Sequence, residues 1–431
     1  MPSINAIKQA RLKKLEAFRQ KGINPYPAEV ERTNTCQEAI DKFDQLAAEK
    51  PAGGRGVILV GRLRTIREHG GSTFAHLEDG SAEFQLYFKK DELGQEDYEF
   101  FLASFDIGDF IQVKGTLFLT KKGEKTLLVK DYRILSKSLA ALPEKWHGLK
   151  DAEERFRKRY LDLLMNKEVK EIFKKRSRTI QKIREFLNER QFIEVETPIL
   201  QPLYGGASAK PFKTHLNSLD IDLYLRIAPE LYLKRLLVGG YERVFEIGRC
   251  FRNEGMDREH NPDFTMLECY AAYWNWQDLM KFMEEMLHSL EPKIFPRQWD
   301  RVEYKDVVKG GDEKESFAKI EKPTFVLHLP NIPLAKNDQA LQGIAQGMEL
   351  IKAFTEQNNP LEQREALEKQ ESLREKGDEE AQPYDKDFIR SLEYGMPPAA
   401  GFGLGLDRLA VLLTEARSLR ESILFPLMKP K

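Results

Sequence analysis

The hydrophobic pattern changes along the first third of the chain. Between Ile4 and Lys21 apolar residues recur at roughly helical spacing and Gly22 follows, which predicts an amphipathic helix. From Arg55 to Leu135 short β-rich runs replace this pattern, separated by turn residues, with a helical stretch near 96–104. The expected strands are Val57–Val60, Phe74–Leu77, Phe84–Phe88, Phe110–Phe118 and Thr126–Val129.

Five such strands suit a small Greek-key barrel, the oligonucleotide/oligosaccharide-binding (OB) fold, which presents one strand face to single-stranded nucleic acid. We expect an aromatic and basic mixture on or beside that face: Arg62, Arg64, Arg67, Phe74, Phe84 and Gln85. Because side chains alternate along a strand, Phe74 and Phe84 could each belong to the core instead. The basic positions of the first helix could likewise follow a phosphate backbone or simply form a solvated face.

The stretch 140–148 is bounded by Pro and Gly and predicts a domain boundary. Beyond it helices and strands mix in an α+β pattern. The charge-rich stretch 362–380 is expected to be a solvated helix. The other expected helices are Ala152–Asn166, Val169–Arg190, Trp276–Leu290 and Asp407–Glu415, and the expected strands are Phe192–Val195, Tyr224–Ile227, Arg243–Arg249, Phe264–Tyr273 and Thr324–Leu329.

Composition narrows the class of protein. The chain has 431 residues, 41% hydrophobic and 32% charged, which favours a multidomain globular protein over a disordered one. No apolar run approaches the roughly 18 residues of a membrane span, so we expect no membrane partner. Three cysteines without close spacing disfavour a disulfide framework and favour the cytoplasm. Because the net charge is −1, only local patches of positive charge could indicate a nucleic-acid partner.

The sequence contains neither a P-loop nor a dinucleotide-binding glycine motif. Two other segments carry more polar and charged residues than packing requires. The segment 251–268 places Arg252, Glu254 and Glu268 on expected neighbouring strands, which suggests a site for an anion and an amine, with surface ion pairing as the alternative. The glycine-rich segment 401–408 leads into a helix that carries Arg408, and taken alone it could equally reflect tight packing.

These segments resemble the three dispersed motifs of the class II aminoacyl-tRNA synthetases, and within that class the lysyl-tRNA synthetases. The three motifs are Phe186–Pro198, Phe251–Glu254 and Gly403–Arg408. Further blocks match the lysyl family: Gly205-Gly206-Ala207, Arg226–Lys234, Ala353–Glu356 and Leu424-Phe425-Pro426. The resemblance runs from the N-terminal helix to the last residues.

The resemblance implies an antiparallel sheet flanked by helices that holds a bent ATP. The implied domains are a basic helix and lead-in (1–54), an OB-fold anticodon-binding domain (55–139), a linker (140–165) and a class II catalytic domain (166–431). Arg252 would contact the α-phosphate and the substrate carboxylate, Phe264 would stack on adenine, and Arg408 would contact the γ-phosphate. Glu254, His260 and Asn261 would complete the nucleotide site.

The resemblance also assigns a lysine pocket. Glu230 would bind the α-amine, and Glu356 with Tyr270 would bind the ε-ammonium, since a buried carboxylate left unpaired by a neutral side chain is costly. Gly206, Glu268, Lys352 and Phe354 would complete this pocket. In the barrel, Phe74 would stack on an anticodon base of tRNA(Lys) while Arg67 and Gln85 bind edges and phosphates. A homodimer through 186–198 is also implied.

The implied reaction is in-line attack of the L-lysine carboxylate on the ATP α-phosphorus, then transfer of lysine to the tRNA, without a general base. Arg252, Arg408 and Glu349 would be its catalytic residues, with Glu349 and position 342 as ligands of Mg²⁺. This chain has Gln342 where the family usually has Glu, and Lys352 where it usually has Asn. We therefore hypothesise that Lys352 partly replaces a metal ion, so that fewer magnesium ions bind.

Other functions stay open at this point. Aspartyl- and asparaginyl-tRNA synthetases share the implied folds, and Lys352 keeps them in consideration, although Glu356 and Tyr270 suit an ammonium better. A paralogue that attaches lysine to a protein is disfavoured by the intact barrel. A non-catalytic RNA-binding protein would be favoured by loss of Arg252 or Arg408, and both are present. The region 290–322 is expected to be a shortened peripheral insertion.

Overall fold

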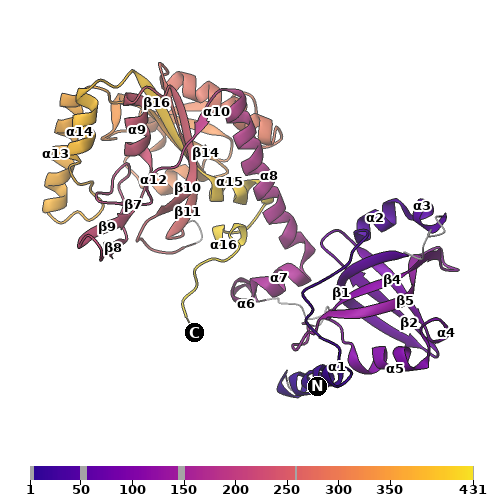
Figure 1. The fold of residues 1–431 in the computed structure, drawn as a ribbon. Coiled ribbons are helices and arrows are strands. Elements are labelled where there is room, and N and C mark those ends of the chain that lie inside the picture. Colours follow the sequence, from indigo (N-terminus) through magenta and orange to yellow (C-terminus); the bar gives the residue numbers. More distant parts are fainter. Residues whose placement is uncertain (1–3, 49–55, 144–150, 258–259, 431) are drawn as a thin grey trace. The chain divides into compact units, whose positions relative to one another are not determined.

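The computed structural model describes residues 4–48, 56–143, 151–257 and 260–430. The chain forms two compact units, 1–148 and 149–431, which are described separately (Figure 1). The first unit contains helices α1 (Ile4–Gln20), α2 (Cys36–Asp41), α3 (Phe43–Ala48), α4 (Lys90–Leu93) and α5 (Gln95–Ser104), and strands β1 (Val57–His69), β2 (Ser72–Glu78), β3 (Glu83–Lys89), β4 (Phe110–Leu119) and β5 (Lys125–Ser136).

The five strands close into a barrel in the order β1-β2-β3-β5-β4, which confirms the predicted OB fold. Strict alternation in β2 and β3 sends every second side chain into the barrel, and Ala75, Leu77 and Leu86 are fully buried there. Helix α5 packs on this core because Phe101 stacks on Phe88, with ring centroids 4.0 Å apart.

The second unit is built on an eight-stranded sheet in the order β12-β13-β14-β15-β16-β11-β10-β6, with a small sheet β7-β9-β8 beside it. Its neighbours are antiparallel except the pairs β12/β13 and β10/β6. The strands are β6 (Ile193–Glu194), β7 (Leu200–Gln201), β8 (Lys213–Leu216), β9 (Ile221–Leu225), β10 (Arg243–Phe251), β11 (Asp263–Ala272), β12 (Asp300–Glu303), β13 (Thr324–Leu327), β14 (Ala335–Ala345), β15 (Met348–Glu356) and β16 (Ala399–Gly405).

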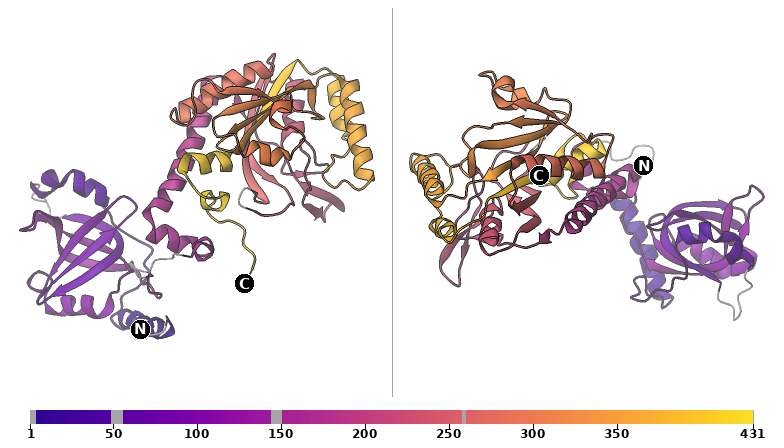
Figure 2. Two further views of the ribbon diagram at one scale, coloured as in Figure 1. Left: turned by 180° about the vertical axis from the view of Figure 1, so that it is seen from behind. Right: turned by 90° about the horizontal axis from the view of Figure 1, so that it is seen from above.

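Helices cover this sheet on both faces. Figures 1 and 2 show α13 and α14 together at one end of the unit, far from α8. The helices are α6 (Ala152–Arg157), α7 (Arg159–Met165), α8 (Lys167–Glu189), α9 (Glu230–Val238), α10 (Trp276–Leu290), α11 (Tyr304–Val307), α12 (Glu313–Phe317), α13 (Pro360–Glu375), α14 (Lys386–Glu393), α15 (Leu406–Thr414) and α16 (Leu419–Ser422).

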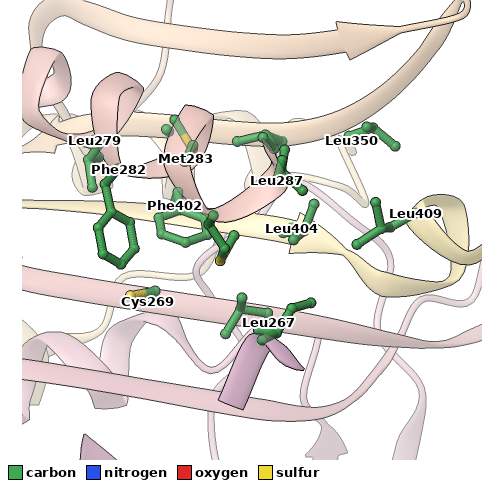
Figure 3. Close-up of a cluster of buried hydrophobic side chains, with 14 of the residues drawn as sticks. Leu267, Cys269, Leu279, Phe282, Met283, Leu287, Leu350, Phe402, Leu404 and Leu409 are labelled. Carbon is green, nitrogen blue, oxygen red and sulfur yellow. The ribbon is translucent and has the colours of Figure 1, made fainter. Parts of the chain in front are cut away.

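The main core fills the space between the sheet and helices α8, α10 and α15. Figure 3 shows Leu279, Phe282, Met283 and Leu287 of α10 above the central strands, which contribute Leu267, Cys269, Phe402 and Leu404. Every second residue of β11 and β16 therefore belongs to this core. The residues between them face the opposite side of the sheet, where helices α9 and α14 pack and where a cavity is lined in part by Glu230 of α9.

Some predicted elements differ from the structure. The single helix expected over Ala152–Asn166 is two, because the backbone leaves the helical region at Lys158 (φ −114°, ψ 47°). This break sends Arg159 inward, where its guanidinium donates to the carbonyls of Arg420 and Leu424. Strands β14 and β15 were not predicted because charged and amide residues interrupt their apolar pattern.

Two expectations about the whole chain can be compared with the structure. Cys36, Cys250 and Cys269 are all buried and free. Among the described residues, no helix is long and apolar enough to cross a membrane.

Candidate active site

A cavity of about 350 Å³ lies on the face of the central strands opposite the α10 core. It collects most of the residues expected to form the site: Gly206, Glu230, Arg252, Glu254, His260, Asn261, Phe264, Glu268, Tyr270, Glu349, Lys352, Phe354 and Arg408. Gln342 and Glu356 do not line it. Segments far apart in the sequence therefore meet at one surface of the sheet.

Strand β16 forms part of the cavity floor and explains the glycine-rich segment. Residues 401–403 line the cavity, and the side chain of Phe402 belongs to the core on the other face. A Cβ at Gly401 would lie 2.3 Å from the Tyr270 ring and 2.7 Å from Glu356 Oε1. Since real Cβ atoms do not approach this closely, glycine is required there for space.

A row of residues paired across β11, β16 and β15 places opposite charges on the cavity. The register aligns Glu268 with Gly403, and Gly403 with Lys352. Gly403 has no side chain, so Glu268 and Lys352 face the same space from strands two spacings, about 10 Å, apart. Lys352 is exposed, and no hydrogen bond or ion pair is recorded for it within the described part of the chain.

The strand-loop-strand around β10 and β11 forms the end of the cavity at which the nucleotide is expected. The Arg252 guanidinium lies over the Phe264 ring, 5.0 Å from its centroid, and this half-buried ring lines the cavity. Asn261 is buried, and its amide donates to the backbone carbonyl and carboxylate of Asp263, both at 2.7 Å. His260 pairs with Asp257, and Glu254 is exposed at the rim. Flat and cationic groups for a purine and its phosphates thus lie together.

Arg408 and Glu349 lie on adjoining elements at the same end. Arg408 Nη1 donates to the Glu349 carbonyl at 2.9 Å and lies 3.6 Å from its carboxylate. Asp407 anchors this end because its carboxylate accepts from the Thr265 N–H at 2.8 Å and pairs with Arg176 at 2.5 Å. The sequence analysis did not identify Asp407 as a site residue.

The closed end of the cavity is rich in buried carboxylates. Glu230, Glu268 and Glu356 are respectively 5%, 3% and 0% exposed. The Tyr270 hydroxyl donates to Glu268 at 3.0 Å. Lys234, which is fully buried, lies 2.6 Å from a Glu230 oxygen and 2.5 Å from Glu356 Oε2. The expected amine-binding residues therefore converge, around a lysine to which the sequence analysis assigned no role.

Burial and like charges shift the ionisation of this cluster. Burial, and then the neighbouring Glu230 carboxylate, raise the pKa of Glu268 to about 8. Burial also raises the pKa of Glu356 to about 8, although Lys234 opposes the shift. Burial disfavours the charged form of Lys234, but Glu230 and Glu356 more than offset it and raise its pKa. An ammonium ligand would be favoured here because it would relieve the crowding of negative charge.

Other residues of the cavity also escaped the sequence analysis. Gln382 accepts a hydrogen bond from the Gly206 N–H at 3.0 Å, and the segment 331–334 lines the cavity wall. No local pattern marks either of them. Lys234 could have been found, since it follows Glu230 by four residues and therefore shares its face of helix α9.

In the barrel, the expected anticodon residues share one outward face. Phe74 is half-buried and its ring lies 4.6 Å from that of Tyr87, which in turn is 6.0 Å from Phe118. Gln85 accepts from Thr126 Oγ1 at 2.6 Å, and exposed Arg67 pairs in register with Phe74. Alternation from Phe74 and Gln85 could have revealed Tyr87.

The remaining candidates in the barrel have structural partners. Phe84 is 2% exposed and belongs to the barrel core, so it does not lie on the outward face. Arg64 pairs with Glu78, and Arg62 donates to the Gly108 carbonyl and lies over the Phe110 ring.

Comparisons with known proteins agree with this geometry. Residues 151–429 match the family model of tRNA synthetases class II (D, K and N), and residues 57–135 match that of the OB-fold nucleic acid binding domain. Lysine--tRNA ligases of Carboxydothermus hydrogenoformans and Clostridium novyi are 42% and 43% identical over 99% of this chain, covering 99% and 95% of their own lengths. The enzyme of Methanoculleus marisnigri is 41% identical over 97% of the chain and 94% of its own.

These alignments also bear on chain length. The first runs over 489 positions, more than the 431 residues of this chain, so the relative carries residues that this chain lacks. Identity at this level over nearly the whole of both proteins leaves no ambiguity about descent. The chain belongs to the class II tRNA synthetases, and within them to the lysine–tRNA ligase family.

Proposed function

We propose that this chain activates L-lysine with ATP and transfers it to tRNA(Lys). The observation that supports lysine as the substrate is the closed end of the cavity, where Glu230, Glu268 and Glu356 are all buried. A site with three buried carboxylates favours a ligand with more than one ammonium group, whereas an aspartate pocket would need a cation for the side chain.

In this proposal the cavity would hold the two substrates for in-line attack. Arg252 lines the cavity beside the Phe264 ring, where it would neutralise the α-phosphate and hold the lysine carboxylate. Phe264 would stack on adenine, with Glu254, His260 and Asn261 around it, and Arg408 would neutralise the γ-phosphate. As the lysine carboxylate attacks the α-phosphorus, pyrophosphate leaves and its charge is met by these guanidinium groups. Positioning and charge neutralisation then supply the catalysis.

The candidate protein ligands of Mg²⁺ fit an ion that is held mainly by the phosphates of the nucleotide. Mg²⁺ usually keeps several waters and takes one or two carboxylates in addition to substrate phosphates. Glu349 lines the cavity and could be such a carboxylate, whereas Gln342 is 5% exposed and does not line it. When bound, the ion would neutralise phosphate charge. Lys352, on the strand paired with Gln342, offers a fixed positive charge toward the same cavity.

The outward face of the barrel would read the anticodon. Phe74, Tyr87 and Phe118 form a line of rings on which bases could stack, and Arg67 and Gln85 add hydrogen-bond donors and acceptors beside them.

A homodimer through 186–198 is part of the proposal. Strand β6 is at the edge of the large sheet, and exposed apolar side chains lie on and just after it: Ile193, Ile199, Leu200 and Leu203. Such a group of exposed apolar residues beside a strand edge is typical of an interface.

The decisive experiment is amino-acid-dependent exchange of pyrophosphate into ATP, with lysine, aspartate, asparagine or no amino acid. Exchange with lysine alone is the expected result. Exchange with none of them, in a folded protein that still binds tRNA, would contradict the proposal and favour an RNA-binding role.

A further inference from the structure

Lys234 is a buried cation, and burying a cation costs hydration free energy. Its side chain is 0% exposed, and it lies within ion-pair distance of Glu230 and Glu356. The proposed reaction gives it no role, because it does not line the cavity and would not touch either substrate. A buried charge is retained only where its partners compensate for the lost hydration.

The carboxylates of this end outnumber their cations. Glu230, Glu268 and Glu356 carry three negative charges when ionised. Among the described residues, Lys234 is the one cation recorded within ion-pair distance of any of them. Two negative charges are then uncompensated, and free lysine brings two ammonium groups.

The oxygens of Glu356 are divided between Lys234 and the cavity floor. Oε2 is the atom next to Lys234, whereas Oε1 lies beside Gly401 and the Tyr270 ring, which leave no room for a Cβ there. Neither Glu356 oxygen accepts a well-aligned hydrogen bond from a described residue. Oε1 is therefore the Glu356 atom left for an ammonium, next to Tyr270 and Gly401, which both line the cavity.

We infer that Lys234 is a built-in counter-ion that sets the charge of the amine end, so that the end is neutral when two ammonium groups of a substrate occupy it. This inference rests on the proposed function and deepens it. Lys234 is a positioning residue: it holds Glu356 and Glu230 in place and fixes how many positive charges the ligand must supply. A monoamino acid would leave one carboxylate uncompensated, and so the counter-ion contributes to the selection of a diamino acid.

The first test compares Lys234→Met with Arg235→Met by calorimetric titration of lysine and, separately, of ATP into the full-length protein. Arg235 is a matched control because it is the next residue of helix α9 and pairs with Asp385 at 2.7 Å, outside the cavity lining. In Lys234→Met we expect lysine affinity to fall by about tenfold or more and ATP affinity to change less than about twofold. Arg235→Met should change neither. Equal losses for both ligands, or unchanged lysine affinity, would overturn the inference.

The second test uses the sign of an effect, which loss of packing cannot imitate. In Glu268→Gln an uncharged amide replaces one carboxylate, so the two ammonium groups of lysine and Lys234 together exceed the remaining negative charge by one. Removing Lys234 from this background restores the balance. The double variant E268Q/K234M should therefore bind lysine more tightly than E268Q alone, and this comparison remains valid if K234M alone does not fold. Weaker binding by the double variant would overturn the inference.

Proton exchange gives an independent readout. Titrations of lysine in two buffers of different ionisation enthalpy report how many protons leave the protein on binding. We expect E268Q/K234M to release about one proton more than E268Q, since without Lys234 the empty site holds a further proton that leaves when two ammonium groups bind. Equal release by these two variants would contradict the counter-ion role. Failure of the wild type to bind lysine at all would instead contradict the proposed function.

Discussion

At the scale of single residues, this site is defined by charges held where water is excluded. Glu268 and Glu356 are almost completely buried and both have a pKa raised to about 8, chiefly by that burial. An empty site therefore holds protons near neutral pH that an exposed carboxylate would have lost. Binding of an ammonium and release of a proton are consequently linked.

We expect lysine binding to tighten as the pH rises from about 6 to about 8. The reason is that Glu268 and Glu356 bind an ammonium best when ionised, and their pKa of about 8 delays ionisation. Calorimetric titrations of lysine across this pH range would measure the change in affinity, and Glu268→Gln should make the affinity depend less on pH. An affinity that does not change with pH would contradict the account of these two carboxylates.

The raised pKa values of Glu268 and Glu356 also predict how the free energy of unfolding depends on pH. The folded, empty site binds protons that the unfolded chain loses above about pH 4.5, the ordinary value for Glu. The contribution of these groups to the free energy of unfolding should therefore fall as the pH rises from about 4.5 to about 8, and added lysine should reverse the fall.

Lys352 should reduce the number of divalent ions at the nucleotide. In the presence of a non-hydrolysable ATP analogue, we expect the variant Q342E/K352N to bind more Mn²⁺ per site than the wild type, as counted by electron paramagnetic resonance. The substitutions add one carboxylate and remove one cation from neighbouring strands. Lys122→Asn, in an exposed turn of the barrel, is the control. The same count in wild type and double variant would reject metal replacement.

At the scale of elements, strand alternation places the functional side chains. The sequence analysis found most strands and the long helices, and it found α10 at its observed bounds, because their apolar periods are clear. It missed β14 and β15, whose apolar positions are interrupted, and the break at Lys158, which serves a distant contact of Arg159. Most of the residues that line the cavity were named through motif resemblance. Lys234 was missed although its spacing from Glu230 places both on one helix face, whereas the contact of Gln382 with Gly206 is tertiary and no local pattern reveals it.

The line of rings across β2, β3 and β4 gives a prediction about RNA. Phe74→Ala should weaken tRNA charging by about 1–3 kcal/mol, the usual contribution of one stacked base, and leave lysine-dependent pyrophosphate exchange unchanged. Phe110→Ala is a suitable control because it lies eight residues from Phe118 on the same strand and contacts Arg62. Equal losses in charging and exchange would contradict the assignment.

At the scale of the whole molecule, the exposed apolar residues after motif 186–198 predict self-association. Leu200→Asp should convert a dimer into a monomer, because it puts a charge on a segment whose neighbouring residues Ile199 and Leu203 are exposed and apolar. Light scattering after size-exclusion chromatography would measure the mass. Leu361→Asp, at an exposed position of helix α13, should leave the mass unchanged. A wild type that is already monomeric would contradict the proposed dimer.

The position of β16 has a consequence for synthesis on the ribosome. This strand lies between β15 and β11 in the sheet, yet it follows all the other described strands in the chain. The OB barrel, whose strands are contiguous in sequence, can fold while translation continues. The large sheet must instead wait for its central strand to leave the exit tunnel. Until that strand has emerged, β11 and β15 each have an unpaired edge, and the nascent chain is most vulnerable to aggregation in that interval.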